Sequence, residues 1–176
     1  MTLWRISRYA DLSGRGGLHA GGRWHTRGTP VVYLSDHPAT CLLEMLVQVG
    51  QSGNIPLTYQ WLRVDVTGVA IVDVEALSAD WSEQLEHTQA LGDAWLARGS
   101  STLLRVPAVV APATSNYLLN PRHPQARACH VREFVPYPVD PRLARGVFTE
   151  VTETTGAHRG TDEQRMQAGP GGDDGA

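Results

Sequence analysis

Residues 30–50 read PVVYLSDHPATCLLEMLVQVG, and this stretch predicts a strand followed directly by a helix. Its first five residues are mainly β-branched or aromatic, which is typical of a short strand over 30–34. Ser35 or Asp36 can then cap the helix through a side-chain oxygen, and Pro38 suits the first helical turn. The stretch therefore predicts a strand–turn–helix unit.

The helix of this unit is predicted to continue to about Val49, with Gly50 as its stop signal. Apolar residues at helical spacing predict its buried face, which comprises Ala39, Leu42, Leu43, Leu46 and Val47. Because an α-helix turns by roughly 100° per residue, Glu44 falls to the side of this stripe, beside Thr40. We therefore expect Glu44 either to line a cleft or to face water.

The sequence on both sides of this unit adds further short strands. Patterns rich in β-branched and aromatic residues predict strands over 3–7, 57–66, 69–74 and 129–135. An apolar run at 103–111 contains Pro107, which predicts an edge strand or a bulge.

A second helix and two loops complete the predicted elements. Residues 81–98 predict the helix, whose expected core residues are Leu85, Leu91, Trp95 and Leu96. The glycine-rich segment 10–30 and the polar segment 115–124 are predicted to be loops. This mixture predicts a compact α/β or α+β domain with short strands.

The chain has 176 residues, enough for one domain with a substantial core, and its character changes after Arg145. Residues 146–176 are rich in Gly, Thr, Glu, Asp and Gln and have almost no apolar periodicity. Such a segment cannot bury enough apolar surface to offset the entropy of ordering it. We therefore predict a domain over 1–145 and a disordered, acidic, glycine-rich tail over 146–176.

Charge and composition exclude several classes of protein. The formal net charge is −3, and residues 1–145 carry 13 Arg against 12 acidic residues, so the domain lacks the basic stripe expected of a nucleic-acid-binding protein. No apolar run is long enough to span a membrane, and no secretory signal is evident, so we expect a cytoplasmic location. Cys41 and Cys129 form no CxxC pair, and no cluster of metal ligands is present.

Three polar residues form a candidate site. Gly21 and Gly22 allow the backbone before Arg23 to approach a ligand closely, and the guanidinium offers a fork of donors to a phosphate or carboxylate. Tyr33 follows on the predicted strand and Glu44 on the predicted helix. A loop, a strand and a helix in succession can bring these groups into one cleft, although each residue also has an ordinary structural explanation.

The order of several short motifs resembles the RES-domain family. The motifs are Trp4-Arg5, Gly21-Gly22-Arg23-Trp24, VVYLS at 31–35, LLE at 42–44, TQALGDAW at 88–95, VPAVV at 106–110, NYLLNPRHP at 116–124 and DPRL at 140–143. Each motif is moderately specific. Their number, order and spacing across residues 3–143 make the resemblance strong.

This resemblance implies a core related to ADP-ribosyltransferases and a toxin that breaks the nicotinamide–ribose bond of NAD⁺. It implies NAD⁺ as the substrate, phosphate as a co-substrate as in some members, and no separate cofactor or metal. It also implies that Arg23, Tyr33 and Glu44 are the catalytic residues. Arg23 would anchor the pyrophosphate, Tyr33 would stack on nicotinamide, and Glu44 would face the developing positive charge.

Four further residues are predicted to contact the substrate: Arg5, Trp24, Ser115 and Asn116. Two of them have a structural alternative, since Arg5 can form an ion pair and Trp24 can fill the core.

The chain departs from the family pattern at two positions. His25 stands where the family usually has Asn, and Ala108 stands where it has Ser. Ser115, or more distantly Ser82, is a candidate to supply the missing hydroxyl. The third site residue is therefore left open.

Alternatives to NAD⁺ degradation remain. The same residues would serve an ADP-ribosyltransferase that modifies a protein, and Ala108 would fit a non-catalytic binding module. A DNA-binding regulator is disfavoured by the missing basic patch. The resemblance implies that DNA binding belongs to the partner, an Xre-like helix-turn-helix antitoxin that covers the cleft in a hetero-oligomer.

Overall fold

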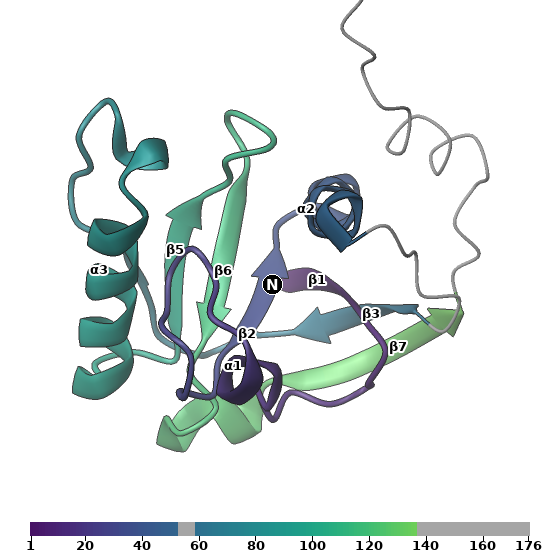
Figure 1. Cartoon of the computed structure of the whole chain (residues 1–176). Coiled ribbons are helices and arrows are strands. Elements are labelled where there is room, and N and C mark those ends of the chain that lie inside the picture. Colours follow the sequence, from purple (N-terminus) through teal and green to yellow (C-terminus); the bar gives the residue numbers. More distant parts are fainter. Residues whose placement is uncertain (53–58, 137–176) are drawn as a thin grey trace, which may run out of the picture.

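The computed structural model describes residues 1–52 and 59–136, and the strands in this part form one mixed sheet (Figure 1). The strand order is β4-β5-β6-β2-β1-β3-β7. Neighbouring strands are antiparallel except for β4 and β5, which are parallel. The strands are β1 (Thr2–Ser7), β2 (Val32–Ser35), β3 (Gln60–Asp65), β4 (Ile71–Asp73), β5 (Leu103–Pro107), β6 (Ser115–Leu119) and β7 (His130–Pro136).

Two longer helices pack on different parts of this sheet, with β6 and β2 between them in Figure 1. Helix α3 packs on β5 and β6 through Trp95 and Leu96, whereas α2 packs on β1 and β2. The helices are α1 (Gly16–His19), α2 (Pro38–Ser52) and α3 (Leu85–Arg98), with 3-10 helices η1 (Trp81–Glu83) and η2 (Pro124–Ala128).

Alternation along the strands divides the side chains between two faces of the sheet. Leu3, Val32 and Leu62 lie on one face, in a core that Leu12 and Ala126 help to cover from outside the sheet. The opposite face, here called the helical face, is the one on which α2 and α3 pack. The strand register places Tyr33, Ser35 and Asn116 on this helical face.

The predicted strand–turn–helix unit is confirmed, but its details differ. His37 caps α2, because its Nδ1 accepts the Ala39 amide, while Ser35 and Asp36 bond elsewhere. The helix also continues past Gly50. The predicted buried face is confirmed at Leu46 and is wrong in part, since Ala39, Leu43 and Val47 are exposed whereas Cys41 and Met45 are buried. Thr40 and Cys41, which have small side chains, are both buried at the start of this inward face.

The segment 115–124 was the largest error in the predicted elements. It contains β6, which is paired on both sides by β2 and β5. Its asparagines look like turn residues in the sequence, but Asn116 and Asn120 are buried and hydrogen-bonded through their side chains. The predicted loop 10–30 also contains the short helix α1, and Leu85 is exposed where α3 begins.

The other predicted strands are confirmed, and so is the mixed α/β class. The expected edge position or bulge at 103–111 is wrong, because β4 and β6 pair with β5 on its two sides in regular register. β5 ends at Pro107, as expected for a residue without an amide proton. The predicted boundary at 145 and the tail lie outside the described residues.

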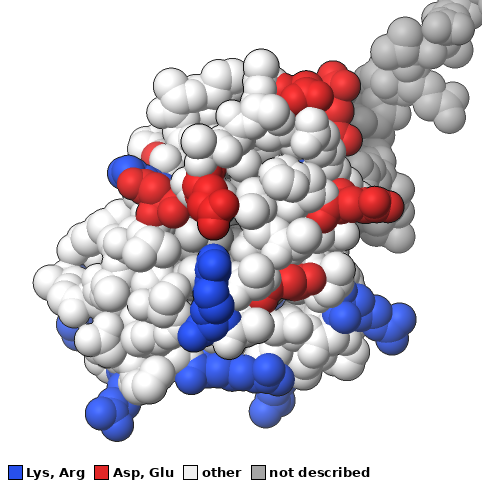
Figure 2. Space-filling view, turned by 90° about the vertical axis from the view of Figure 1, so that its left-hand side faces the viewer, with Lys and Arg blue, Asp and Glu red and all other residues white. Residues whose placement is uncertain are grey.

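No helix in 1–52 or 59–136 is long and apolar enough to cross a membrane. On the face shown in Figure 2, acidic and basic side chains form separate groups without a continuous basic stripe.

Candidate active site

Arg23 lies at the tip of a tight turn. The Gly22 amide donates to the His25 carbonyl at 3.0 Å, so Arg23 and Trp24 occupy the two positions between them. Helix α3 supports the same turn, because Gln89 Nε2 donates to the Gly22 carbonyl at 2.8 Å. The turn that the glycines predict is therefore built against a helix far away in sequence.

The guanidinium of Arg23 is half-buried against η1. Its Nη1 donates to the Ser82 carbonyl at 2.8 Å, and its Cζ lies 5.9 Å from the centroid of the Trp81 ring. Within the described residues this is the only hydrogen bond of the guanidinium, so other donors remain for an anion. Ser82 thus contributes its backbone carbonyl, and not the hydroxyl that the sequence singled out.

Trp24 fills the core, which is the structural alternative to a substrate contact that the sequence left open. Its side chain is 2% exposed and its ring stacks on Trp81, with centroids 5.6 Å apart at an angle of 29°. A ring in this position fills the core and has no free face for a nucleobase. Its burial ties the turn to α3 and η1.

Gly92 of α3 allows this close packing. A Cβ atom at Gly92 would lie within van der Waals overlap of the Trp24 carbonyl oxygen, which is backbone and cannot rotate away. A glycine in the middle of a helix costs stability by itself, so its presence here is explained by the approach of the turn.

We expect Gly92→Ala to destabilise the protein by about 1–3 kcal/mol and to weaken any activity that depends on Arg23, because α3 and the turn must separate. Thermal unfolding and substrate turnover would measure the two effects. Gly16→Ala is the matched control, since a Cβ there meets nothing within 4 Å. Equal melting temperatures for Gly92→Ala and Gly16→Ala would contradict the assigned role.

The Tyr33 hydroxyl holds the turn from the side of the sheet. It accepts a hydrogen bond from the Trp24 amide at 3.2 Å and lies 2.9 Å from His25 Nδ1. Burial raises the pKa of the Tyr33 phenol far above its usual value, so the hydroxyl stays protonated. Only a residue without a side chain fits over this ring at Gly22, because a Cβ atom there would lie 2.7 Å from the Tyr33 hydroxyl oxygen.

Glu44 is oriented by two polar side chains of the sheet. Ser35 Oγ donates to Asn116 Oδ1 at 2.7 Å, which leaves Asn116 Nδ2 to donate to Glu44 Oε1 at 2.7 Å. The sequence predicted Asn116 as a substrate contact, whereas the structure shows it holding the carboxylate. Ser35 had no assigned role, although its position two residues after Tyr33 on a strand indicates the same face.

Arg23, Tyr33 and Glu44 converge on the helical face. Tyr33 and Ser35 point to the same side of β2, and the charges of Glu44 and Arg23, with that of Asp93, all act on the Tyr33 phenol. The three groups come from a turn, a strand and a helix, as their spacing suggested. Their region lies between α2 and α3.

Strand alternation directs Arg5 and Ser115 to the other side of the sheet, although Cys41 of α2 and Tyr59 lie close enough to act on the Arg5 guanidinium electrostatically. Strand alternation turns Arg5 away from its neighbour Trp4 and toward Asp11, whose carbonyl oxygen is 3.5 Å from Nη1. The same alternation separates Ser115 from Asn116. Ser115 therefore does not replace the hydroxyl absent at the buried Ala108.

Neither a reactive thiol nor a metal cluster is found in the part described. Burial raises the pKa of the Cys41 thiol to about 12, so it is a packed thiol. No group of three His, Cys, Asp or Glu side chains in 1–52 and 59–136 is arranged to hold a metal ion.

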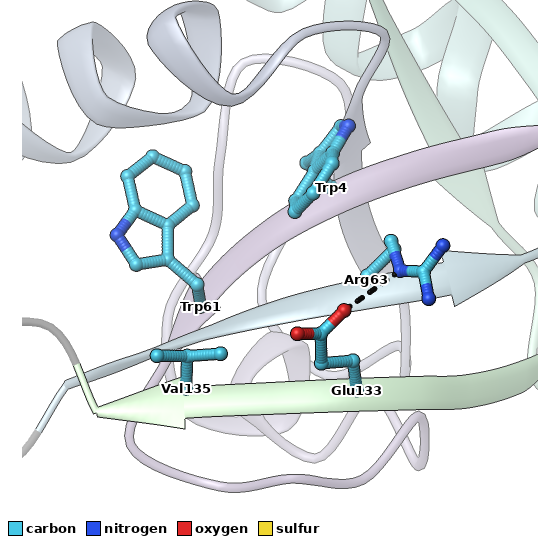
Figure 3. A pocket seen from close by; sticks show the side chains of 5 residues that line it. All are labelled: Trp4, Trp61, Arg63, Glu133 and Val135. Carbon is cyan, nitrogen blue, oxygen red and sulfur yellow. Dashed lines mark ion pairs between the residues drawn. The ribbon is translucent and has the colours of Figure 1, made fainter.

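A separate cavity of about 230 Å³ lies on β1, β3 and β7 (Figure 3). Its lining comprises Trp4, Trp61, Arg63, Glu133 and Val135, and Arg63 Nε pairs with the Glu133 carboxylate at 3.0 Å. Both ions are about half exposed, so the pair contributes little stability. None of the predicted site residues lines this cavity.

Comparison with known proteins supports one family. A model of the RES domain matches residues 2–140. The chain is 46% identical over 140 residues to "Toxin Res" of Pseudomonas putida, covering 77% of this chain and 97% of that protein. It is 31% identical over 157 residues to "Prs ADP-ribosylating toxin" of Sphingobium sp., with coverage of 82% and 97%.

A third named protein is found both among the sequence relatives and among the solved structures. "NAD(+) phosphorylase MbcT" of Mycobacterium tuberculosis is 30% identical over 91 residues, which are 48% of each chain. A chain of the solved M. tuberculosis MbcT–MbcA toxin–antitoxin complex matches with a TM-score of 0.66 at 21% identity, covering 83% of this chain and 87% of that chain. This structural likeness shows a shared fold.

Proposed function

The chain belongs to the RES domain family, and from this premise we propose that it is a toxin that cleaves the nicotinamide–ribose bond of NAD⁺. The observation that carries the proposal is the convergence of Arg23, Tyr33 and an oriented Glu44 on one face of the sheet. One relative is named an ADP-ribosylating toxin and another an NAD(+) phosphorylase, which supports NAD⁺ as the substrate class.

Glu44 is suited to stabilise the reacting ribose. Cleavage of this bond passes through an oxocarbenium-like ribose, and a fixed carboxylate lowers the energy of that state. Asn116 holds Oε1, whereas Oε2 accepts no hydrogen bond from the described residues. In our proposal Oε2 faces the ribose, and the Ser35–Asn116 pair keeps the carboxylate from rotating.

Arg23 and Tyr33 would bind the rest of the substrate. The free donors of the Arg23 guanidinium suit the pyrophosphate. The Tyr33 hydroxyl is engaged by the turn, so its remaining contribution is the ring, which can pack against nicotinamide. The nicotinamide leaves, and phosphate or water attacks the ribose carbon.

Incubating the purified protein with NAD⁺, with and without phosphate, tests the proposal. If phosphate is the acceptor, we expect nicotinamide and ADP-ribose 1″-phosphate, and only when phosphate is present. If water is the acceptor, we expect nicotinamide and ADP-ribose in both incubations. Mass spectrometry would distinguish the two. NAD⁺ that stays intact with folded protein both with and without phosphate would reject the enzyme assignment in favour of a non-catalytic binding module, the alternative that Ala108 raises.

A second candidate is ADP-ribosylation of a protein, which the Sphingobium relative's name favours. Labelled NAD⁺ and a cell extract would separate the two functions. A transferase would leave the label on one or a few proteins, whereas NAD⁺ degradation would leave it in small molecules.

We also propose an antitoxin as the protein partner. The matched structure is a toxin–antitoxin complex, and the family resemblance implies a helix-turn-helix protein that covers the cleft. Co-expression with a neighbouring open reading frame should restore growth and yield a co-purifying complex. Growth arrest that no neighbouring product relieves would contradict this assignment.

A further inference from the structure

His25 is buried beneath the Arg23 turn, and both of its ring nitrogens face polar atoms. His25 is only 3% exposed. Nε2 lies 3.1 Å from the Ala20 carbonyl oxygen, and Nδ1 lies 2.9 Å from the Tyr33 hydroxyl. These two contacts connect the end of α1, the turn and β2 through one imidazole ring.

The contacts determine where the protons lie. A carbonyl oxygen only accepts, so Nε2 must carry the proton that reaches Ala20. In the neutral ring Nδ1 is then an acceptor, and the Tyr33 hydroxyl donates to it. The same hydroxyl oxygen accepts from the Trp24 amide, so Tyr33 is engaged both as donor and as acceptor.

Resting on the proposed function, we infer that His25 is a positioning residue: only its neutral Nε2–H form accepts the Tyr33 hydroxyl proton and so holds the Arg23 turn ready for NAD⁺. Protonation would place a second donor on Nδ1. The Tyr33 hydroxyl proton would then lose its acceptor, in a site that is shielded from water.

Each element that packs on His25 places a charged or polar group near its ring. Arg23 lies two residues away in its own turn, β2 supplies the Tyr33 hydroxyl, α3 supplies the Asp93 carboxylate, and the α1 end supplies the Ala20 carbonyl. Burial lowers the pKa of His25, while Ala20 and Asp93 oppose this in part. Because the folded state favours the neutral ring, the ordered turn is retained at the ordinary histidine pKa and above, and it is lost as the pH falls through the lowered pKa of His25 in the folded protein.

Two substitutions test the two ring nitrogens of His25 separately. An Asn side chain places a polar atom near the position of Nδ1, whereas Gln reaches the position of Nε2. We expect His25→Gln to lose the Tyr33 bond and to raise KM for NAD⁺ about five-fold or more with a smaller effect on kcat. His25→Asn should restore KM to near its original value and should remove the rise in KM that the native protein shows toward pH 5.5.

His19→Asn is the matched control, because His19 lies exposed on α1, outside the contacts of His25. Its KM should follow the native pH profile. An identical acid rise in KM for the native protein and His25→Asn would overturn the inference. So would a His25→Gln variant with native KM.

A readout without substrate keeps this test separate from that of the proposed function. In the ¹⁵N NMR spectrum of the free protein, His25 should show the Nε2–H tautomer, and the Trp24 amide signal should titrate with it. In His25→Asn the amide signal should stay constant over the same pH range. If the protein left NAD⁺ intact but showed these signals, the positioning role would stand and the proposed reaction would fail. An Nδ1–H tautomer, or a Trp24 amide indifferent to His25, would refute the positioning role itself.

Discussion

Glu44→Gln is expected to lower kcat for NAD⁺ cleavage by about 100-fold or more, with a much smaller change in KM. The substitution removes the negative charge that faces the developing oxocarbenium. It keeps the shape of the side chain and an oxygen that can accept from Asn116 Nδ2, so the fold should survive. Steady-state kinetics and thermal unfolding would measure the two effects separately.

Glu86→Gln is the control for this prediction, because Glu86 is exposed in the first turn of α3. It should turn over NAD⁺ at the native rate. If Glu44→Gln retained full turnover in a folded protein, Glu44 would not be catalytic. Its bond to Asn116 would then be structural only.

Arg23→Ala is expected to weaken NAD⁺ binding by about 2–3 kcal/mol, or about 30- to 150-fold, because a charge-assisted contact to phosphate is lost. The change also removes the bond to the Ser82 carbonyl and the contact with the Trp81 ring. Calorimetry with NAD⁺ on a Glu44→Gln background would measure binding without turnover.

Two further variants distinguish the anchoring role from a general effect of charge. Arg23→Lys keeps the charge but lacks the planar fork, so its affinity should fall between those of the native protein and Arg23→Ala. Arg27→Ala removes an exposed arginine of the same loop and should bind normally. Equal losses for Arg23→Ala and Arg27→Ala would show that only net charge matters.

Local sequence signals were sufficient for much of the fold. The β-branched run before Ser35 and the helical spacing after it predict β2 and α2 without knowledge of their neighbours. Such elements are set by backbone preference and by the period of apolar residues. The same signals failed at 115–124, because asparagines that favour turns in isolation are hydrogen-bonded within a central strand.

The roles of site residues were harder to predict than their identity. Arg23, Tyr33 and Glu44 were selected by spacing and by resemblance, and the structure brings them to one face. Their partners come from 59 to 72 residues further along the chain, since Ser82 bonds Arg23 and Asn116 bonds Glu44. A pattern within a short window carries no information about such pairs.

The sequence by itself determined the elements of the central unit, the mixed fold class and the family, because these depend on local preference and on ordered motifs. Only the tertiary structure decided that Trp24 fills the core, that Asn116 holds Glu44, and that His25 bonds Tyr33. The first two depend on which strand pairs with which and on how closely α3 approaches the turn, and the third depends on how the turn packs on β2. Pairing across the sheet and close packing bring distant residues together, and that is the information that local sequence lacks.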